Sequence, residues 1–370
     1  LNEIAPAVKD LVNSSLSEGK FPECIKIAKI VCIYKNKGNK SDKSNYRPVS
    51  NLAFFGKCIE VAVDIQLRRY CETNNLFGSH QQGFRKARST STALLTAATR
   101  WRTNKAQRKF QGVLFFDLSA AYDLLDKEVF LKKAAIVGIT GVALSWLASY
   151  LTDRRQVVQV NDARSSIRLL GFGTPQGSAC SCLLFALFVG DICLWLNDGL
   201  IQAYADDTFI TVEADSIEQL RKKMEAAGES VLEYFNINRM VTNPGKTAML
   251  VFRPTSSNNI ADRVRICLSG EAIDESDAEK ALGVWITSDL KWKCQTEKLI
   301  NELNYGVSVL WRLRKMLGNK EMKMIAEGLI MSRIRYCLHV YGVEGLRINS
   351  EQSTSGLQQA VQKVQNNVLR

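Results

Sequence analysis

The stretch IQAYADDTFITV, residues 201–212, is the most informative part of this 370-residue chain. Apolar residues stand on both sides of its two adjacent acids, a pattern that predicts two strands joined by a turn at Asp206 and Asp207. Adjacent carboxylates between buried strands repel each other, and a nearby cation offsets that cost. The alternative is an exposed hairpin turn with two solvated acids. The stretch therefore predicts either a cation site or a plain surface turn.

Two other stretches carry related signals. Residues 113–117, VLFFD, predict an apolar strand that ends in Asp117, a common position for a catalytic group at a sheet edge. Residues 173–178, GTPQGS, predict a tight glycine loop in front of a strongly apolar helix over residues 182–195. Carboxylates held on rigid strand ends suit Mg²⁺, which takes hard oxygen ligands.

The rest of the chain mixes strands and helices without strict alternation. This mixture favours an α+β fold with a mainly antiparallel sheet. Further helices are expected at residues 1–16, 59–71, 91–108, 127–137, 142–151, 217–235, 295–317 and 321–338, and further strands at residues 27–34, 247–252 and, as a hairpin, 156–160 with 167–171.

Composition narrows the class of function. The chain has 49 Lys and Arg against 37 Asp and Glu, a formal charge of +12, which suits a polyanionic partner such as nucleic acid or an anionic membrane surface. Its longest apolar run, residues 182–189, is far shorter than the ~20 residues that cross a bilayer, so membrane function is disfavoured. The ten cysteines include no CxxC pair and there are two histidines, a poor set for zinc. Because the chain starts with Leu, we expect it to be a piece of a longer polypeptide.

Three motifs resemble those of reverse transcriptases and occur in that family's order: FDLSAAYD at 116–123, GTPQGS at 173–178 and YADD at 204–207. The likeness spans roughly residues 21–342 and is closest to the non-LTR (LINE-type) retrotransposon subgroup, and within it to Jockey-like elements. It rests further on NYRPVS at 45–50, QGFR at 82–85, NPGKT at 243–247, LGV at 282–284 and RYCLHVYG at 335–342.

The resemblance implies a right-hand polymerase with fingers, a palm whose antiparallel sheet carries the acids, and a helical thumb. Residues 1–112 would form an N-terminal extension and the fingers, 113–293 the palm with a fingers insertion, and 294–370 the thumb and the start of a connecting region. The implied reaction is RNA-directed DNA synthesis, the addition of dNTPs to a DNA primer on an RNA template. The family primes on nicked chromosomal DNA, which implies nuclear action, a cytoplasmic ribonucleoprotein, and flanking endonuclease and zinc-knuckle modules of the same polyprotein.

The resemblance also assigns the catalytic residues. Asp117, Asp206 and Asp207 would be the catalytic acids and would hold two Mg²⁺ ions, for which Mn²⁺ can substitute, with the Leu118 carbonyl as a further ligand. Lys246 would be the general acid for the departing pyrophosphate, or would act only through its charge.

Other residues would hold the substrates. Arg47 would contact the triphosphate, with Lys35 assisting it unless Lys35 is a surface loop lysine. Tyr122 would exclude a ribose 2′-hydroxyl, unless it is an ordinary core tyrosine. Gln176 and Gly177 would lie beside the nucleotide and template. Leu282, Gly283 and Val284 would form the primer grip, and basic residues after position 293 would track the duplex: Lys298, Arg312, Arg314, Lys315, Lys320 and Lys323.

Three alternatives stay open on sequence grounds. A maturase-type or telomerase-type reverse transcriptase would share this shape. A viral RNA polymerase is disfavoured by Ala205, because such enzymes usually carry Gly-Asp-Asp, and by Tyr122, because they need a second acid downstream of the first motif for ribose recognition. A catalytically inactive remnant that only binds RNA would not need the intact acids.

Overall fold

The computed structural model describes residues 3–36, 38–118, 121–196, 198–242, 246–254 and 263–342. The chain forms two compact units that are interleaved in sequence. The fingers unit is Leu1–Phe84, Asp117–Asn197 and Glu229–Asn243, and the palm–thumb unit is Arg85–Phe116, Asp198–Gly228 and Pro244–Arg370. The domain boundaries expected after residues 112 and 293 stay predictions. Several motif residues lie outside the described residues, namely Ser119, Ala120, Asn243, Pro244 and Gly245, as do residues 343–370 of the expected thumb and connecting region.

The fingers unit is built around a sheet in which β2 (Tyr46–Asn51), β1 (Ile27–Tyr34), β4 (Arg155–Val160) and β5 (Ala163–Arg164) lie in that order, with β6 (Arg168–Leu169) also pairing with β4. The strand expected at residues 27–34 is confirmed. β1 pairs antiparallel with β2 but parallel with β4. The parallel pair is an exception within the mainly antiparallel pattern that was expected. It can form because more than a hundred intervening residues supply the long crossover that parallel strands need.

Helices and aromatic rings complete the fingers unit. Phe21, Trp146 and Tyr150 form one cluster, with Trp146 and Tyr150 stacked at 5.1 Å between ring centroids. The apolar helix expected over 182–195 ends early, at Phe188, and Gly190 just beyond it lies against the Leu76 carbonyl, where an added Cβ would stand 3.0 Å away. The helices are α1 (Ala5–Glu18), α2 (Phe54–Thr73), α4 (Lys127–Ile136), α5 (Gly141–Leu151) and α6 (Ser181–Phe188), with short 3-10 turns at Glu23–Ile25, Lys43–Asn45, Ala121–Asp123 and Ile192–Trp195.

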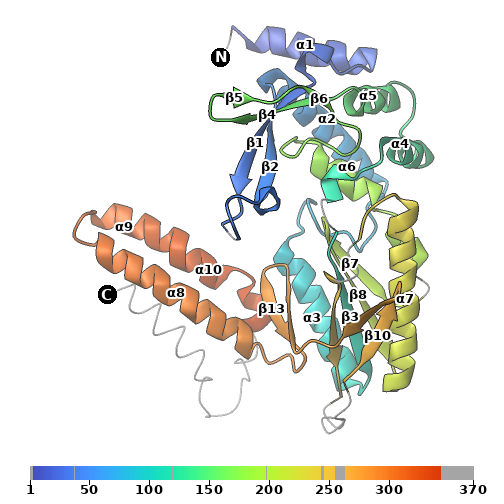
Figure 1. The fold of residues 1–370 in the computed structure, drawn as a ribbon, viewed down its shortest axis with the longest axis vertical. Helices are drawn as coiled ribbons and strands as arrows, with labels where there is room; N and C mark the ends of the chain where they lie inside the picture. Colours follow the sequence, from blue (N-terminus) through green and yellow to red (C-terminus); the bar gives the residue numbers. More distant parts are fainter. Residues whose placement is uncertain are drawn as a thin grey trace. The chain divides into compact units, whose positions relative to one another are not determined.

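The palm–thumb unit contains the palm sheet, in which β7 (Leu200–Tyr204), β8 (Asp207–Ala214), β3 (Phe110–Phe116) and β9 (Ala248–Phe252) lie in that order. All three pairings are antiparallel, which confirms the expected palm sheet. Helices α3 (Thr90–Ala106) and α7 (Ile217–Ile237) cover its two faces (Figure 1). Trp101 of α3 packs on Phe209 and Phe252. On the other face, a Cβ at Gly112 would meet the Met224 sulfur at 2.0 Å, so a larger residue here would have to push the Met224 side chain of α7 aside.

One buried core runs through the palm–thumb unit. It joins Leu94 of α3, Phe209 of the palm sheet, Val284 of a hairpin, and Leu303 and Ile330 of the thumb helices. The helix expected over 321–338 is interrupted by a π-helical turn, Glu327–Met331, and then by Cys337 at a φ of 52°. The remaining elements are the hairpins β10 (Arg265–Leu268) with β11 (Glu271–Asp274) and β12 (Ala278–Ala281) with β13 (Val284–Thr287), and the helices α8 (Lys293–Leu313), α9 (Asn319–Ala326), α10 (Ser332–Arg335) and α11 (Leu338–Tyr341).

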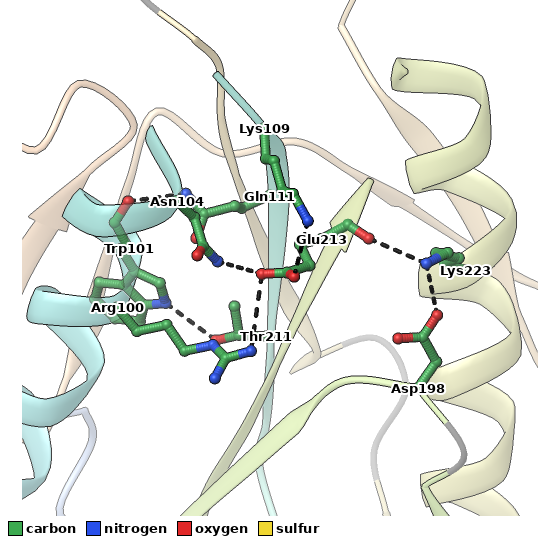
Figure 2. A network of polar contacts seen from close by, with 9 residues as sticks. All are labelled: Arg100, Trp101, Asn104, Lys109, Gln111, Asp198, Thr211, Glu213 and Lys223. Atoms are coloured by element: carbon green, nitrogen blue, oxygen red, sulfur yellow. Dashed lines mark hydrogen bonds and ion pairs between the residues drawn. The ribbon is translucent and has the colours of Figure 1, made fainter. Parts of the chain in front are cut away.

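A polar network fixes α3 to the palm sheet (Figure 2). The Trp101 indole donates to the Thr211 hydroxyl at 3.0 Å, and the buried Gln111 amide donates to the Trp101 carbonyl at 2.9 Å. Asn104 donates to both Gln111 and Glu213. Because these groups are buried, each bond also avoids the cost of an unpaired polar group. The network therefore sets the position of α3 on the sheet.

Candidate active site

The predicted acid turn is a two-residue hairpin loop. Tyr204 pairs with Asp207, which leaves Ala205 and Asp206 as the loop between β7 and β8. Ala205 is buried and has a φ of 61°, a value that favours glycine at the first position of such a turn. A non-glycine residue held there stores of order 1–3 kcal/mol of strain, a feature that clusters at functional sites. Asp206 is half-buried and Asp207 is exposed.

The sheet register brings two further predicted residues to this end of the palm sheet. Phe116, the last residue of β3, pairs with Thr208, and Asp117 is the next residue of the chain. β9 begins at Ala248, which pairs with Phe115, so Lys246 precedes β9 at the same sheet end. Lys246 is exposed. The register thus places the acid turn, the end of β3 and the approach to β9 side by side.

The donor chemistry at this end of the sheet suits a divalent ion. Asp206 and Asp207 offer hard carboxylate oxygens on a rigid turn, the ligand type that Mg²⁺ takes along with substrate phosphates and water. Within the described ranges, no three acidic, histidine or cysteine side chains lie close enough together to hold a metal by themselves. Leu118, the predicted carbonyl ligand, is buried and forms an isolated antiparallel bridge with Thr242.

The predicted positioning loop, Gly173–Ser178, docks on the segment that contains Tyr122. Thr174 N–H donates to the Tyr122 carbonyl at 2.9 Å and Gly173 N–H to the Leu125 carbonyl at 2.8 Å. The Gln176 amide donates to the Asp123 carboxylate at 2.7 Å. Gly173 has a φ of 79°, and a Cβ there would stand 2.6 Å from the Asp123 backbone, so this approach requires glycine.

The same loop also covers the outer edge of β2. Ser50 N–H donates to the Gln176 carbonyl at 2.8 Å, and Gly177, at a φ of 107°, lies against the Ser50 carbonyl. A cavity of about 280 Å³ borders this junction, with Ser50, Asp123, Arg154 and Gln176 among its lining residues. The structure therefore brings Gln176 and Gly177 together with the strand that carries Arg47.

A buried polar chain supports the loop from behind. Glu60 of α2 is fully buried and accepts from the Tyr150 hydroxyl at 3.1 Å and from the Ala179 N–H at 3.0 Å. The Tyr150 and Ser178 hydroxyls lie 2.6 Å apart. Burial, followed by the nearby Glu60 carboxylate, raises the pKa of Tyr150 well above its usual value. Tyr150 therefore stays protonated and can act as a donor to Glu60.

The other residues predicted to contact the nucleotide are Tyr122, Arg47 and Lys35. The Tyr122 ring packs on Phe185 with 4.9 Å between centroids. Arg47 is exposed and pairs with Ile33 across β1 and β2, so its side chain lies on the sheet face away from the cavity, which Cys32 and Pro48 line. Lys35 donates from Nζ to the Ser44 carbonyl at 2.9 Å, within its own turn.

The predicted primer grip is a second two-residue hairpin loop. Ala281 pairs with Val284, and Leu282 and Gly283 have φ values of 46° and 81°. Positive φ at both loop positions is the pattern of a type I′ turn. Leu282 is an unusual residue for this position, and its side chain is buried.

Three residues of this framework were not assigned a role from the sequence: Glu60, Asp123 and Tyr150. The sequence does contain a signal for Glu60: it is an acid beside Ile59 and before Val63, on the apolar face of the expected helix 59–71. Asp123 lies within the quoted motif 116–123 but forms its bond with a residue fifty-three positions away. Tyr150 looked like an ordinary residue on the apolar face of its helix.

Comparison with known proteins agrees with this arrangement. A family model described as reverse transcriptase (RNA-dependent DNA polymerase) matches residues 34–286. The chain is 24% identical over 343 residues to the RNA-directed DNA polymerase from mobile element jockey of Drosophila funebris, covering 90% of this chain and 37% of that protein. It is 23% identical over 378 residues to the probable RNA-directed DNA polymerase from transposon BS of Drosophila melanogaster, covering 97% of this chain and 40% of that protein.

The chain thus spans 37–40% of the length of these curated relatives. Among solved structures, apo telomerase from Candida Tropicalis aligns over 99% of this chain and 72% of that chain, with a TM-score of 0.50 and 11% identity. That likeness concerns the fold alone, and it agrees with the α+β architecture described above. From the match over residues 34–286, the chain belongs to the reverse transcriptase (RNA-dependent DNA polymerase) family.

Proposed function

We propose that the chain is the RNA-directed DNA polymerase core of a non-LTR, LINE-type retrotransposon. The observation that carries the proposal is the acid turn, a strained hairpin that presents Asp206 and Asp207. The sheet register places the end of β3, the residue before Asp117, beside this turn. Family membership and the relatives from mobile elements support it. An RNA-binding remnant would gain nothing from a strained turn that presents two acids.

The proposed site uses two divalent ions, Mg²⁺ or in its place Mn²⁺, held by Asp117, Asp206 and Asp207 with the Leu118 carbonyl. When bound, such ions activate the primer 3′-hydroxyl and neutralise charge on the phosphates. Lys246, at the same end of the palm sheet, supplies a cation for the departing pyrophosphate.

The remaining residues position the substrates. Arg47 offers a guanidinium fork to the triphosphate, and Lys35 adds charge at the tip of the fingers sheet. Gln176 and Gly177 position the nucleotide and template, and the Tyr122 ring excludes a ribose 2′-hydroxyl. Leu282, Gly283 and Val284 hold the primer end.

The partners follow from this chemistry. The natural template is RNA, the primer is DNA, and the basic thumb helices bind the duplex in a salt-dependent manner. We also propose that the chain acts on chromosomal DNA in the nucleus and travels as a cytoplasmic ribonucleoprotein, with endonuclease and zinc-knuckle modules in the same polyprotein.

Primer extension tests the proposal. The assay uses oligo(dT) on poly(rA) with Mg²⁺ and dTTP, and compares the wild type with the double variant Asp206→Asn, Asp207→Asn. Asp215→Asn, at the opposite end of β8, is the matched control. We expect extension by the wild type and the control, and none by the double variant. Extension that survives the double substitution would place the chemistry elsewhere. If all three proteins bind the duplex and none extends it, the RNA-binding remnant is the better description.

A further inference from the structure

Tyr336 joins elements of the palm–thumb unit that are far apart in sequence. It follows α10, and its hydroxyl donates to the Leu282 carbonyl at 2.7 Å. Its ring lies against Gly283, where an added Cβ would stand 3.3 Å from it. One tyrosine therefore contacts both residues of the grip turn, Leu282–Gly283: its hydroxyl binds the Leu282 carbonyl and its ring packs against Gly283.

This contact explains how the grip turn keeps its conformation. Leu282 has a φ of 46°, which the Cβ of an L residue disfavours. Burial of the side chain and the bond from Tyr336 to its carbonyl both favour this conformation. Loss of the hydroxyl would leave the turn held by packing and by the pairing of β12 with β13.

The segment at Tyr336 is also joined, through helix α3, to β7, the strand that leads into the acid turn. The next residue, Cys337, has its thiol 3.3 Å from the Ser91 hydroxyl of α3, and the Ala93 carbonyl of the same helix accepts from the Gln202 amide of β7 at 3.4 Å. Tyr204 packs against the same core cluster that contains Leu282 and Cys337. Tyr204 is the residue that pairs with Asp207 across the acid turn.

We propose that Tyr336 is a positioning residue that ties the grip turn to the acid turn, so that the primer 3′ end and the catalytic carboxylates keep a fixed spacing. The inference rests on the proposed function for its consequence in catalysis, but the tie itself is a property of the folded chain. Tyr336 touches neither substrate nor metal in this role.

Two substitutions separate this role from ordinary packing. Tyr336→Phe removes the hydroxyl and keeps the ring on Gly283. Tyr341→Phe is the matched control, because the Tyr341 hydroxyl also donates to a backbone carbonyl, that of Ile334, without contact to the grip turn. Both variants are made in the full 370-residue chain.

The first measurement is amide hydrogen exchange without nucleic acid, followed by peptides that cover residues 200–210 and 278–287. We expect Tyr336→Phe to speed exchange in both peptides at least about threefold, and Tyr341→Phe in neither. Faster exchange in 278–287 alone, or equal effects of the two substitutions, would overturn the tie.

The second measurement is single-turnover addition of dTTP to a matched primer and to one with a mismatched 3′ end. Tyr336→Phe should lower the rate on the matched primer about tenfold, leave the Kd for dTTP unchanged and narrow the matched-to-mismatched ratio. Wild-type rates and ratio in Tyr336→Phe would overturn the positioning role. If Tyr336→Phe speeds exchange in both peptides but the wild type does not extend primers, the proposed function is overturned and the structural link between the two turns still stands.

Discussion

The acid turn and the positioning loop are held in place by different physical means. The acid turn, residues 204–208, depends on strand register and on apolar packing of Phe209 under α3. The positioning loop, residues 173–178, together with Ala179 after it, depends on hydrogen bonds to Glu60, Tyr122, Asp123 and Ser50. Strand register and apolar packing do not depend on any single polar group. A buried chain of hydrogen bonds, in contrast, is weakened when one of its partners is removed. The turn should therefore respond mainly to changes in backbone conformation, and the loop to single polar substitutions.

The largest effect is expected from Ala205→Val. A β-branched residue is poorly tolerated at a φ of 61°, and Ala205 is also buried. We expect the free energy of unfolding to fall by about 1–3 kcal/mol, and primer extension to fall at least about 100-fold, because the carboxylates are displaced. Ala205→Gly, which fits the conformation, should keep extension within about twofold. Denaturant unfolding and extension rates measure both, and wild-type extension by the valine variant would show that the turn's backbone does not position the acids.

Glu60→Gln tests the polar support of the positioning loop. The Glu60 carboxylate accepts from two donors, the Tyr150 hydroxyl and the Ala179 N–H, whereas the glutamine amide has one acceptor oxygen and one NH₂ group. One buried hydrogen bond is therefore lost, which lowers the free energy of unfolding by about 1–3 kcal/mol. Denaturant unfolding should show that loss, while Glu18→Gln on the exposed side of α1 should change nothing measurable. If Glu60→Gln unfolds like the wild type, the chain through Tyr150 and Ala179 does not hold the loop.

A smaller effect is expected from Thr211→Val in the palm sheet. The substitution keeps the shape and removes the acceptor for the buried Trp101 indole (Figure 2), which should lower the free energy of unfolding by about 1 kcal/mol. Extension per folded molecule should not change, because apolar packing still holds β8 and the acid turn. A drop in extension without a drop in stability would contradict the claim that packing and register suffice.

The smallest effect is a pH dependence at Asp126, which begins α4 next to the loop's docking segment. Burial raises the pKa of this carboxyl, but the Val129 N–H and the Arg239 guanidinium outweigh it, so the pKa is lowered in the folded chain. A lowered pKa stabilises the fold above the unfolded-state value of about 4, and the benefit is lost as pH falls through the folded-state value.

Asp126→Asn keeps a helix cap and removes the charge. The wild type should be more stable than this variant by less than about 1 kcal/mol at pH 7, and the difference should shrink toward zero as pH falls below about 4. Unfolding measured across this pH range provides the check. A difference that stays constant with pH would mean that the charge of Asp126 contributes nothing.

Local patterns in the sequence were enough to predict several elements and the acid turn. Apolar residues on both sides of Asp206 and Asp207 predicted the hairpin, and the strand over 27–34 was confirmed residue for residue. Contacts between distant segments were not predictable, because no local pattern encodes them. The parallel pairing of β1 with β4, the bond from Gln176 to Asp123 and the contact of Tyr336 with Leu282 all join segments more than fifty residues apart. The assignments of individual substrate contacts stay predictions.

The most direct test of the central claim counts the divalent ions that the site holds. Mn²⁺ bound per chain can be measured by electron paramagnetic resonance in the presence of an RNA–DNA template–primer and a non-hydrolysable dNTP. The account predicts two ions for the wild type and for Asp215→Asn, and a clear loss for the double variant Asp206→Asn, Asp207→Asn. An equal count in the double variant would show that these acids do not hold the metals, and would contradict the proposed polymerase site.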